Sequence, residues 1–120
     1  SQVNLTACGV ISNEMIKFSN PRMKEMASGC ESLELTEACS WEEFPSFAEK
    51  YIKQIGASLN KKIETVDMHI WEIEYSGSVL NFVYDDFPNG ISIEPKNKKG
   101  QKAVNEIHQV AFEQREPNGL

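Results

Sequence analysis

The most regular pattern in the chain is the alternation of apolar and polar residues between Trp71 and Pro95. Successive side chains of a strand point to opposite faces, so alternation of this kind predicts strands with one apolar face. The alternation is interrupted at Ser76-Gly77, which favours a tight hairpin, and again over residues 85–90, where Pro and Asn-Gly favour a longer loop. The stretch therefore predicts a three-stranded antiparallel meander, with strands at about 62–75, 79–84 and 91–94.

Two amphipathic helices and one more strand accompany the meander. Ser40 followed by Glu43 forms a capping box, and Gly56 suits a helix C-terminus, so a helix is expected between them. A second helix is expected over about 101–114, and the alternation in SLELT predicts a short strand at 32–36. Apolar residues recur at helical spacing in both helices: Phe44, Phe47, Tyr51 and Ile55 in the first, and Val104, Ile107 and Val110 in the second.

The expected order is strand, helix, three-stranded meander, helix. Short antiparallel connections and two one-sided helices predict an α+β fold, with an antiparallel sheet of about four strands and both helices on one face. We expect residues 30–116 to form this single domain. Residues 1–29 are expected to be an N-terminal extension that forms a strand or an arm, and residues 117–120 a tail.

The sheet face that the helices leave uncovered is the candidate binding surface. It combines an apolar patch with acidic neighbours, a composition typical of a surface that binds a partner. The alternative is that residues 1–29 fold across it. The residues expected on this face are Met68, Ile70, Glu72, Glu74, Val79, Asn81, Val83, Ser92 and Glu94.

Charge narrows the choice of partner. The chain has 18 acidic and 12 basic residues, which gives a net charge of -6. Phosphate backbones repel such a chain, so nucleic acid is disfavoured, whereas a basic protein would be attracted. The acidity can also serve solubility alone. No apolar run approaches the roughly 20 residues of a membrane span, and we expect a soluble, cytoplasmic protein.

Catalytic and metal-binding patterns are weak in this sequence, and we predict no catalytic residue, metal or cofactor. His69 is expected as a core or edge histidine, and Cys8, Cys30 and Cys39 as reduced thiols because no Cys-x-x-Cys pair occurs; one disulfide is the alternative. The pair Asp85-Asp86 fits a carboxylate pair, a cation site, a hot-spot loop of an interface or a simple turn. A small enzyme therefore stays open as an alternative.

The stretch from residue 32 to residue 110 resembles small bacterial α+β proteins. One such group is a domain family of unknown function in which a Trp-bearing strand, a small-Gly turn and a strand ending in Glu recur. Here these elements are Trp71, Ser76-Gly77 and the stretch 91–94. The chain also resembles immunity proteins of contact-dependent growth inhibition systems, which are often small, acidic and cytoplasmic.

The second resemblance implies that the protein inhibits a cognate toxin, often a nuclease, by direct binding. Carboxylates would meet toxin lysines or arginines while apolar side chains anchor the complex. The alternative functions are a small enzyme and a homodimerising structural domain, and both monomer and homodimer stay open. The residues expected to contact the partner are Met68, Ile70, Glu72, Glu74, Asp85, Asp86 and Glu94.

Overall fold

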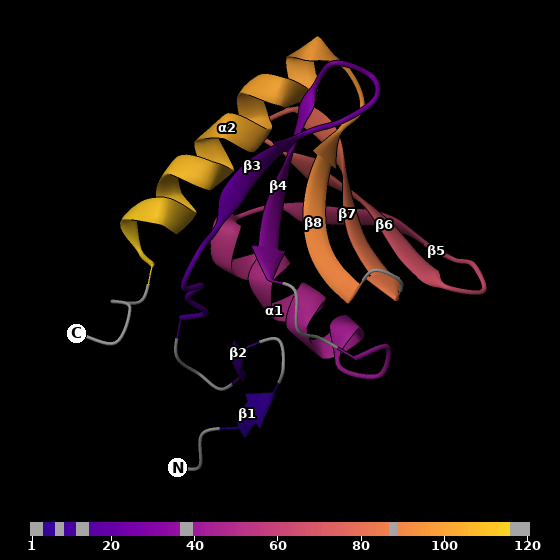
Figure 1. The fold of residues 1–120 in the computed structure, drawn as a ribbon, viewed down its shortest axis with the longest axis vertical. Helices are drawn as coiled ribbons and strands as arrows, with labels where there is room; N and C mark the ends of the chain where they lie inside the picture. Colours follow the sequence, from indigo (N-terminus) through magenta and orange to yellow (C-terminus); the bar gives the residue numbers. More distant parts are fainter. Residues whose placement is uncertain (1–3, 7–8, 12–14, 37–39, 87–88, 116–120) are drawn as a thin grey trace.

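The computed structural model describes residues 4–6, 9–11, 15–36, 40–86 and 89–115. Its centre is a six-stranded antiparallel sheet in the order β3-β4-β8-β7-β6-β5 (Figure 1). The strands are β3 (Arg22–Glu25), β4 (Glu31–Thr36), β5 (Ser58–Glu64), β6 (Met68–Tyr75), β7 (Ser78–Asp86) and β8 (Asn89–Pro95). A separate two-stranded sheet pairs β1 (Asn4–Thr6) with β2 (Gly9–Ile11), and the helices are α1 (Phe44–Ile55) and α2 (Lys98–Glu113).

The expectation of about four strands built around a meander is wrong, because the sheet has six strands. One additional strand, β3, lies within the stretch 1–29 that was expected to be an extension, and it pairs with β4. The other, β5, was read together with β6 as one long strand over 62–75, whereas the chain reverses between them.

The turn between β5 and β6 is made by side chains and contains neither Gly nor Pro. The Thr65 N–H donates to the Met68 carbonyl at 2.8 Å, and the Met68 N–H donates to Thr65 Oγ1 at 3.0 Å. The Thr65 hydroxyl also donates to Asp67 Oδ1 at 3.3 Å. Threonine and aspartate can bond nearby backbone groups in this way, so they replace the usual turn residues and hide the reversal from a pattern search.

Two of the sheet's other hairpins, β6–β7 and β7–β8, have short connections. Ser76 and Gly77 have φ angles of 53° and 82°, the left-handed pair of a type I′ turn, which confirms the predicted hairpin. Between β7 and β8, Asp85 pairs with Gly90 and Asp86 with Asn89. The expected loop over 85–90 is therefore mostly strand, and residues 87–88 lie outside the described residues.

Helix α1 ends where its Gly56 signal predicts, but it begins at Phe44, after a turn over residues 41–43 that the Ser40–Glu43 bonds hold. The Ser40 N–H donates to Glu43 Oε1 at 3.1 Å, and the Glu43 N–H donates to Ser40 Oγ at 3.2 Å. This reciprocal pair is the predicted capping box. At the other end, Gly56 takes a φ of 77°, which a residue without Cβ adopts freely, and its N–H bonds the last turn.

Helix α2 begins at Lys98 instead of residue 101. The side chain of Asn97 accepts a hydrogen bond from the Gly100 N–H at 2.9 Å and caps the helix there. Gly100 is buried, and a Cβ at this position would lie 3.1 Å from Leu80 Cδ2 and 3.3 Å from Pro95 Cβ. The missing side chain lets the first turn of α2 pack directly on β7 and β8.

Both helices cover the same face of the sheet. Leu33, Ile93, Phe82 and Trp71 are register neighbours across β4, β8, β7 and β6, and all four are buried under the helices. Aromatic contacts join the layers: the ring of Phe44 lies 5.2 Å from that of Trp71. Other helix residues in this core are Phe47, Ala48, Tyr51, Ile52, Ala103, Val104 and Ile107.

Residues 15–20 extend the helix side of the molecule. The side chain of Gln54 in α1 accepts from the Ile16 N–H at 2.7 Å and donates to the Ile16 carbonyl at 2.9 Å. Phe18 is buried, with its ring 5.8 Å from Phe47 and 5.3 Å from Tyr51. The stretch 15–25 therefore packs beside α1 and then adds β3 to the sheet edge, so it does not lie across the opposite face.

Candidate binding face

The side of the sheet away from α1 and α2 has no helix over it among the described residues, and we call it the open face (Figure 1). Register places side chains from all six strands on it. One row crosses the strands as Glu34, Ser92, Val83, Ile70 and Ile63. The other open-face residues are Arg22, Lys24, Ser32, Lys61, Met68, Glu72, Glu74, Val79, Asn81, Asp85, Gly90 and Glu94.

A first group of ion pairs lies at the β3 side of the open face. The Glu34 carboxylate is 2.9 Å from Arg22 Nε and 3.5 Å from Lys24 Nζ. Both cations come from β3, directly across the ladder from β4. These pairs are partly exposed, so each contributes little to stability, about 0–1 kcal/mol. Their main effect is to leave little net charge at this side.

A second group of ion pairs lies around Glu72. Its Oε1 is 2.6 Å from Lys96 Nζ and 4.0 Å from Lys61 Nζ, and its Oε2 accepts from Asn60 Nδ2 at 3.3 Å. Hydrogen bonds from Lys96 and then Asn60 lower the pKa of the Glu72 carboxyl. Glu72 is therefore a carboxylate that the chain's own lysines already neutralise.

Between the two ion-pair groups the open face is hollowed, with a volume of about 390 Å³. Gly90, Ser92 and Ser32 have small side chains and leave this space open, and Asp85 and Glu94 also line it. Burial raises the pKa of the Glu94 carboxyl, and the Asp85 carboxylate raises it further. Among the described residues, no cation pairs with Glu94.

Apolar side chains continue from the hollow toward the β5–β6 turn. Ile63, Ile70 and Val83 are register neighbours on β5, β6 and β7, and Met68 lies beside them opposite Asp85. Val83 is buried, Met68 and Ile70 are half-buried, and Ile63 is 42% exposed. We call these four residues the apolar strip. It provides hydrophobic contact area next to Asp85, which lies opposite Met68.

Six of the seven residues predicted to contact a partner lie on the open face: Met68, Ile70, Glu72, Glu74, Asp85 and Glu94. Asp86 does not. It accepts a hydrogen bond from the Tyr84 hydroxyl at 2.8 Å, on the side of the sheet that carries Tyr84 and His69. Burial and this bond raise the pKa of Tyr84 to about 12. The Asp85-Asp86 pair is therefore divided between the two faces, as strand alternation requires.

Several open-face residues were missed by sequence reasoning. Arg22 and Lys24 line the hollow from β3, whose stretch was expected to be an extension. The polar-apolar-polar pattern after Pro21 is the signal that could have found this strand, because Met23 packs against the core. Ile63 was missed because the β5–β6 turn was not recognised.

The most unusual buried polar group on the helix side is His69, which is 3% exposed. Its Nε2 lies 3.3 Å from the Trp41 carbonyl oxygen; because a carbonyl only accepts, the proton is on Nε2. Nδ1 is buried without a hydrogen-bond partner. The Trp41 ring lies against the imidazole with the ring centroids 3.8 Å apart and the planes tilted by 33°, and the Phe44 ring stacks on it at 5.1 Å. His69 is thus a core histidine, as expected.

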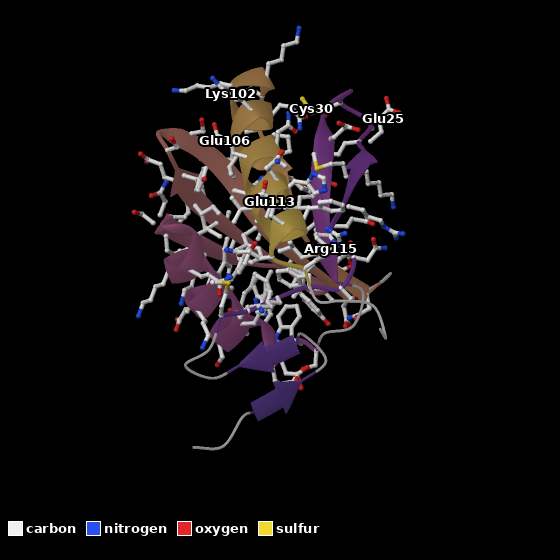
Figure 2. The ribbon with its side chains drawn as sticks, turned by 90° about the vertical axis from the view of Figure 1, so that its left-hand side faces the viewer. Glu25, Cys30, Lys102, Glu106, Glu113 and Arg115 are labelled. Carbon is white, nitrogen blue, oxygen red and sulfur yellow. The ribbon has the colours of Figure 1, made fainter. Side chains whose placement is uncertain are left out.

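Other candidate chemistry does not assemble in the described parts of the chain. Cys30 is a free, half-buried thiol, and Cys8 and Cys39 lie outside the described residues. No three His, Cys, Asp or Glu side chains group to hold a metal ion in these ranges. Figure 2 shows the exposed side of α2, where Lys102, Glu106 and Glu113 differ in sign, so no single-sign patch forms there.

Comparisons with known proteins agree with the resemblance to a domain family of unknown function. No curated protein and no solved structure matches the chain. None of the helices in the described residues is long and apolar enough to cross a bilayer. The family model for "Protein of unknown function (DUF3630)" matches residues 22–109, from the start of β3 into α2. The chain therefore belongs to this family of proteins of unknown function.

Proposed function

We propose that the protein is a binding protein whose open face docks a basic segment of another protein. The observation that carries the proposal is the Glu94 carboxyl, which is half-buried at the hollow, has a raised pKa and has no cation partner among the described residues. A lysine or arginine from a partner would supply the missing positive charge. Such a charge-assisted contact is strongest where both groups are partly shielded from water.

The neighbouring ion pairs restrict where that cation can bind. Glu34 and Glu72 already have cation partners from the chain itself. Glu94 has no such partner among the described residues, and after burial the Asp85 carboxylate is the second cause of its raised pKa. The binding position for a partner cation is therefore the hollow over Gly90 and Ser92 and not the whole acidic surface.

The apolar strip supplies the second part of the proposed contact. Hot spots of protein interfaces combine an apolar anchor with a polar contact that neighbouring residues shield from water. Ile63, Met68 and Ile70 are partly exposed beside Asp85. A partner segment that alternates basic and apolar residues would match the strip and the hollow together.

The finer form of the proposal is an immunity protein that neutralises a cognate toxin, as the resemblance to such proteins implies. A nuclease toxin carries basic groups that bind phosphate, and the carboxylates of the open face would occupy them. The net charge of -6 supports the encounter of the chain with such a domain.

A peptide titration followed by amide NMR tests the coarser proposal. The probe is a synthetic peptide that alternates Lys and Leu, and its control is the same peptide with Glu in place of Lys. We expect shifts centred on β7 and β8 around Glu94 for the Lys peptide only. Shifts centred on α2, or equal shifts with both peptides, would contradict the proposal.

Variants make this test residue-specific. Glu94→Lys should weaken binding at least tenfold, while reversal of the exposed Lys98 and Lys99 to Glu should change it less than twofold. Asp85→Asn and Asp86→Asn form a matched pair with the same chemistry on opposite faces. Only Asp85→Asn should weaken binding; equal losses would contradict a role for the open face.

The finer proposal needs a toxin as the readout. The product of the gene immediately upstream, expressed in a bacterial host, should arrest growth, and co-expression of this chain should relieve the arrest. Glu94→Lys should reduce the protection. If the neighbouring product is harmless while the Lys-Leu peptide still binds the open face, the immunity role is wrong and the binding role stands.

A further inference from the structure

Strand β5 presents a free sheet edge. It pairs with β6 on one side and is the last strand in the sheet order, so its other side has no strand beside it in the described structure. All seven residues of β5 are exposed. Ile63 is 42% exposed, and Val66 at the following turn is fully exposed. An exposed edge of this kind offers unpaired N–H and C=O groups to another strand.

A bulge disrupts pairing along the first half of β5, whereas the second half has a regular ladder and carries both lysines of the strand. The register shifts between Leu59 and Lys61, which marks a bulge at Asn60. Bulges and lysines are common devices that prevent edge-to-edge association. From Lys61 to Glu64 the ladder is regular, with the sequence Lys-Lys-Ile-Glu. Any strand that pairs with this edge must therefore use the second half.

Symmetry limits how two copies could pair through this edge. An antiparallel pair related by a two-fold axis places one residue opposite itself, because directly opposite side chains share a face. Centring the axis on Lys61, Lys62 or Glu64 would put two identical charges in contact, which is destabilising. Centring it on Asn60 would use the bulge.

Only the register centred on Ile63 avoids these conflicts. It places Ile63 against Ile63 of the second copy on the open face. Lys62 then lies opposite Glu64, and Glu64 opposite Lys62. Within its own chain the Lys62 Nζ is 3.5 Å from Glu49 Oε2, so each Lys62 would lie between that carboxylate and Glu64 of the second copy. Lys61 lies opposite Thr65, which carries no charge. The charge pattern of the strand is thus complementary to itself in one register alone.

We propose that two copies of the chain associate through β5, in the antiparallel register centred on Ile63, to form one continuous sheet. Figure 1 shows the β5–β6 hairpin extending beyond α1 at the right of the view. The paired segment is short, so the interface is at the small end of specific interfaces and association should be weak. The pairing goes beyond the proposed function: it leaves the hollow at Glu94 uncovered and shares only Ile63 with the apolar strip.

Sedimentation velocity over a range of protein concentrations tests the pairing. The full chain should shift from monomer to dimer as its concentration rises. Lys62→Glu and Glu64→Lys each place like charges across the axis and should raise the dimer Kd at least tenfold. Lys61→Glu, the matched control on the same strand, should change the Kd less than threefold. Thermal unfolding of each variant checks that it is folded.

A mixture of the two weakened variants makes the test decisive. In a mixed dimer, the glutamate introduced at position 62 of one variant meets the lysine introduced at position 64 of the other. The unchanged Glu64 of the first variant meets the unchanged Lys62 of the second, so both pairs are again of opposite charge. The equimolar mixture should therefore dimerise within threefold of the original chain. A chain that stays monomeric throughout, or a dimer that both single variants leave unchanged, would overturn the proposal.

Discussion

The two faces of the sheet are built from the same strands but differ in composition and burial. Phe82 and Val83 are adjacent in β7, yet Phe82 lies among the rings under α1 while Val83 belongs to the apolar strip of the open face. On the helix face, register rows are apolar across four strands. On the open face, charges and small side chains alternate with a few apolar ones. Strand alternation only divides the side chains between the two faces. Burial under the helices then decides which face contributes most to stability.

The largest difference in stability between the two faces is expected when the same residue type is truncated on each face of β6. Ile73 is completely buried under the helices and Ile70 is half-buried on the open face. Ile73→Ala should lower the free energy of unfolding by about 2–5 kcal/mol, because it removes contacts and leaves a cavity. Ile70→Ala should cost clearly less. Urea unfolding measures both, and equal losses would mean that the open face is part of the core.

Adding a side chain at Gly100, where α2 packs tightly on the sheet, should have the next largest effect on stability. A side chain at Gly100 would meet Leu80 and Pro95 at 3.1–3.3 Å. Gly100→Val should therefore destabilise the protein by about 1–3 kcal/mol through overpacking. Thermal unfolding measures the loss. A variant as stable as the original would show that α2 can move away from the sheet without cost.

The contact of residues 15–18 with α1 is a smaller contribution on the helix side. Gln54 makes two hydrogen bonds to the backbone of Ile16. Gln54→Ala leaves this N–H and carbonyl without their partners and should cost about 1–2 kcal/mol. Hydrogen exchange at the Ile16 amide should increase more than at amides of β7. Unchanged exchange would mean that this segment is held by Phe18 alone.

The smallest expected effects come from two glutamates of the open face, and their signs differ. The folded pKa of Glu94 is raised, so ionisation opposes folding: stability falls as the pH rises through the range of that pKa. Glu94→Gln should therefore stabilise the protein at neutral pH. Below the ordinary pKa of a glutamate, about 4.3, the difference should disappear because the carboxyl is protonated in both states.

Glu72 should show the opposite behaviour. Its folded pKa is lowered, so its ionised form supports folding above the ordinary glutamate pKa, and this support is lost as the pH falls through the lowered value. Glu72→Gln should destabilise the protein at neutral pH and have no effect in strong acid. Urea midpoints of both variants against pH give the test; shifts of the same sign would contradict the division between ion-paired and unpaired carboxylates.

Local signals in the sequence predict the elements but not the full sheet. The capping box of Ser40 and Glu43 and the turn at Ser76-Gly77 depend on neighbouring residues, and both are confirmed. The predicted number of strands was wrong for two reasons: β3, only four residues long, was not recognised, and the turn at Thr65–Asp67 was missed. Both depend on pairing or side-chain bonds that a periodicity search does not detect.

The residues of the candidate site could be predicted only in part, because local patterns assign a residue to a face but not its distant partners. Alternation placed Met68, Ile70 and Glu72 on one face of β6, as the register shows. It could not show that Lys96, distant in the chain, neutralises Glu72. Nor could it show the hollow, which depends on small residues of β8 and β4 lying side by side. The role of these residues in partner binding stays a prediction.

The contact of Trp41 with His69 makes tryptophan fluorescence a local probe of this part of the molecule. The chain has two tryptophans: Trp71 lies in the core, and Trp41 rests on the imidazole just before α1. Phenylalanine at one position or the other would yield two singly labelled proteins, whose emission reports either the centre of the molecule or the entry to its first helix. Coincident transitions would indicate cooperative melting, and an earlier change at Trp41 would reveal that this entry opens by itself.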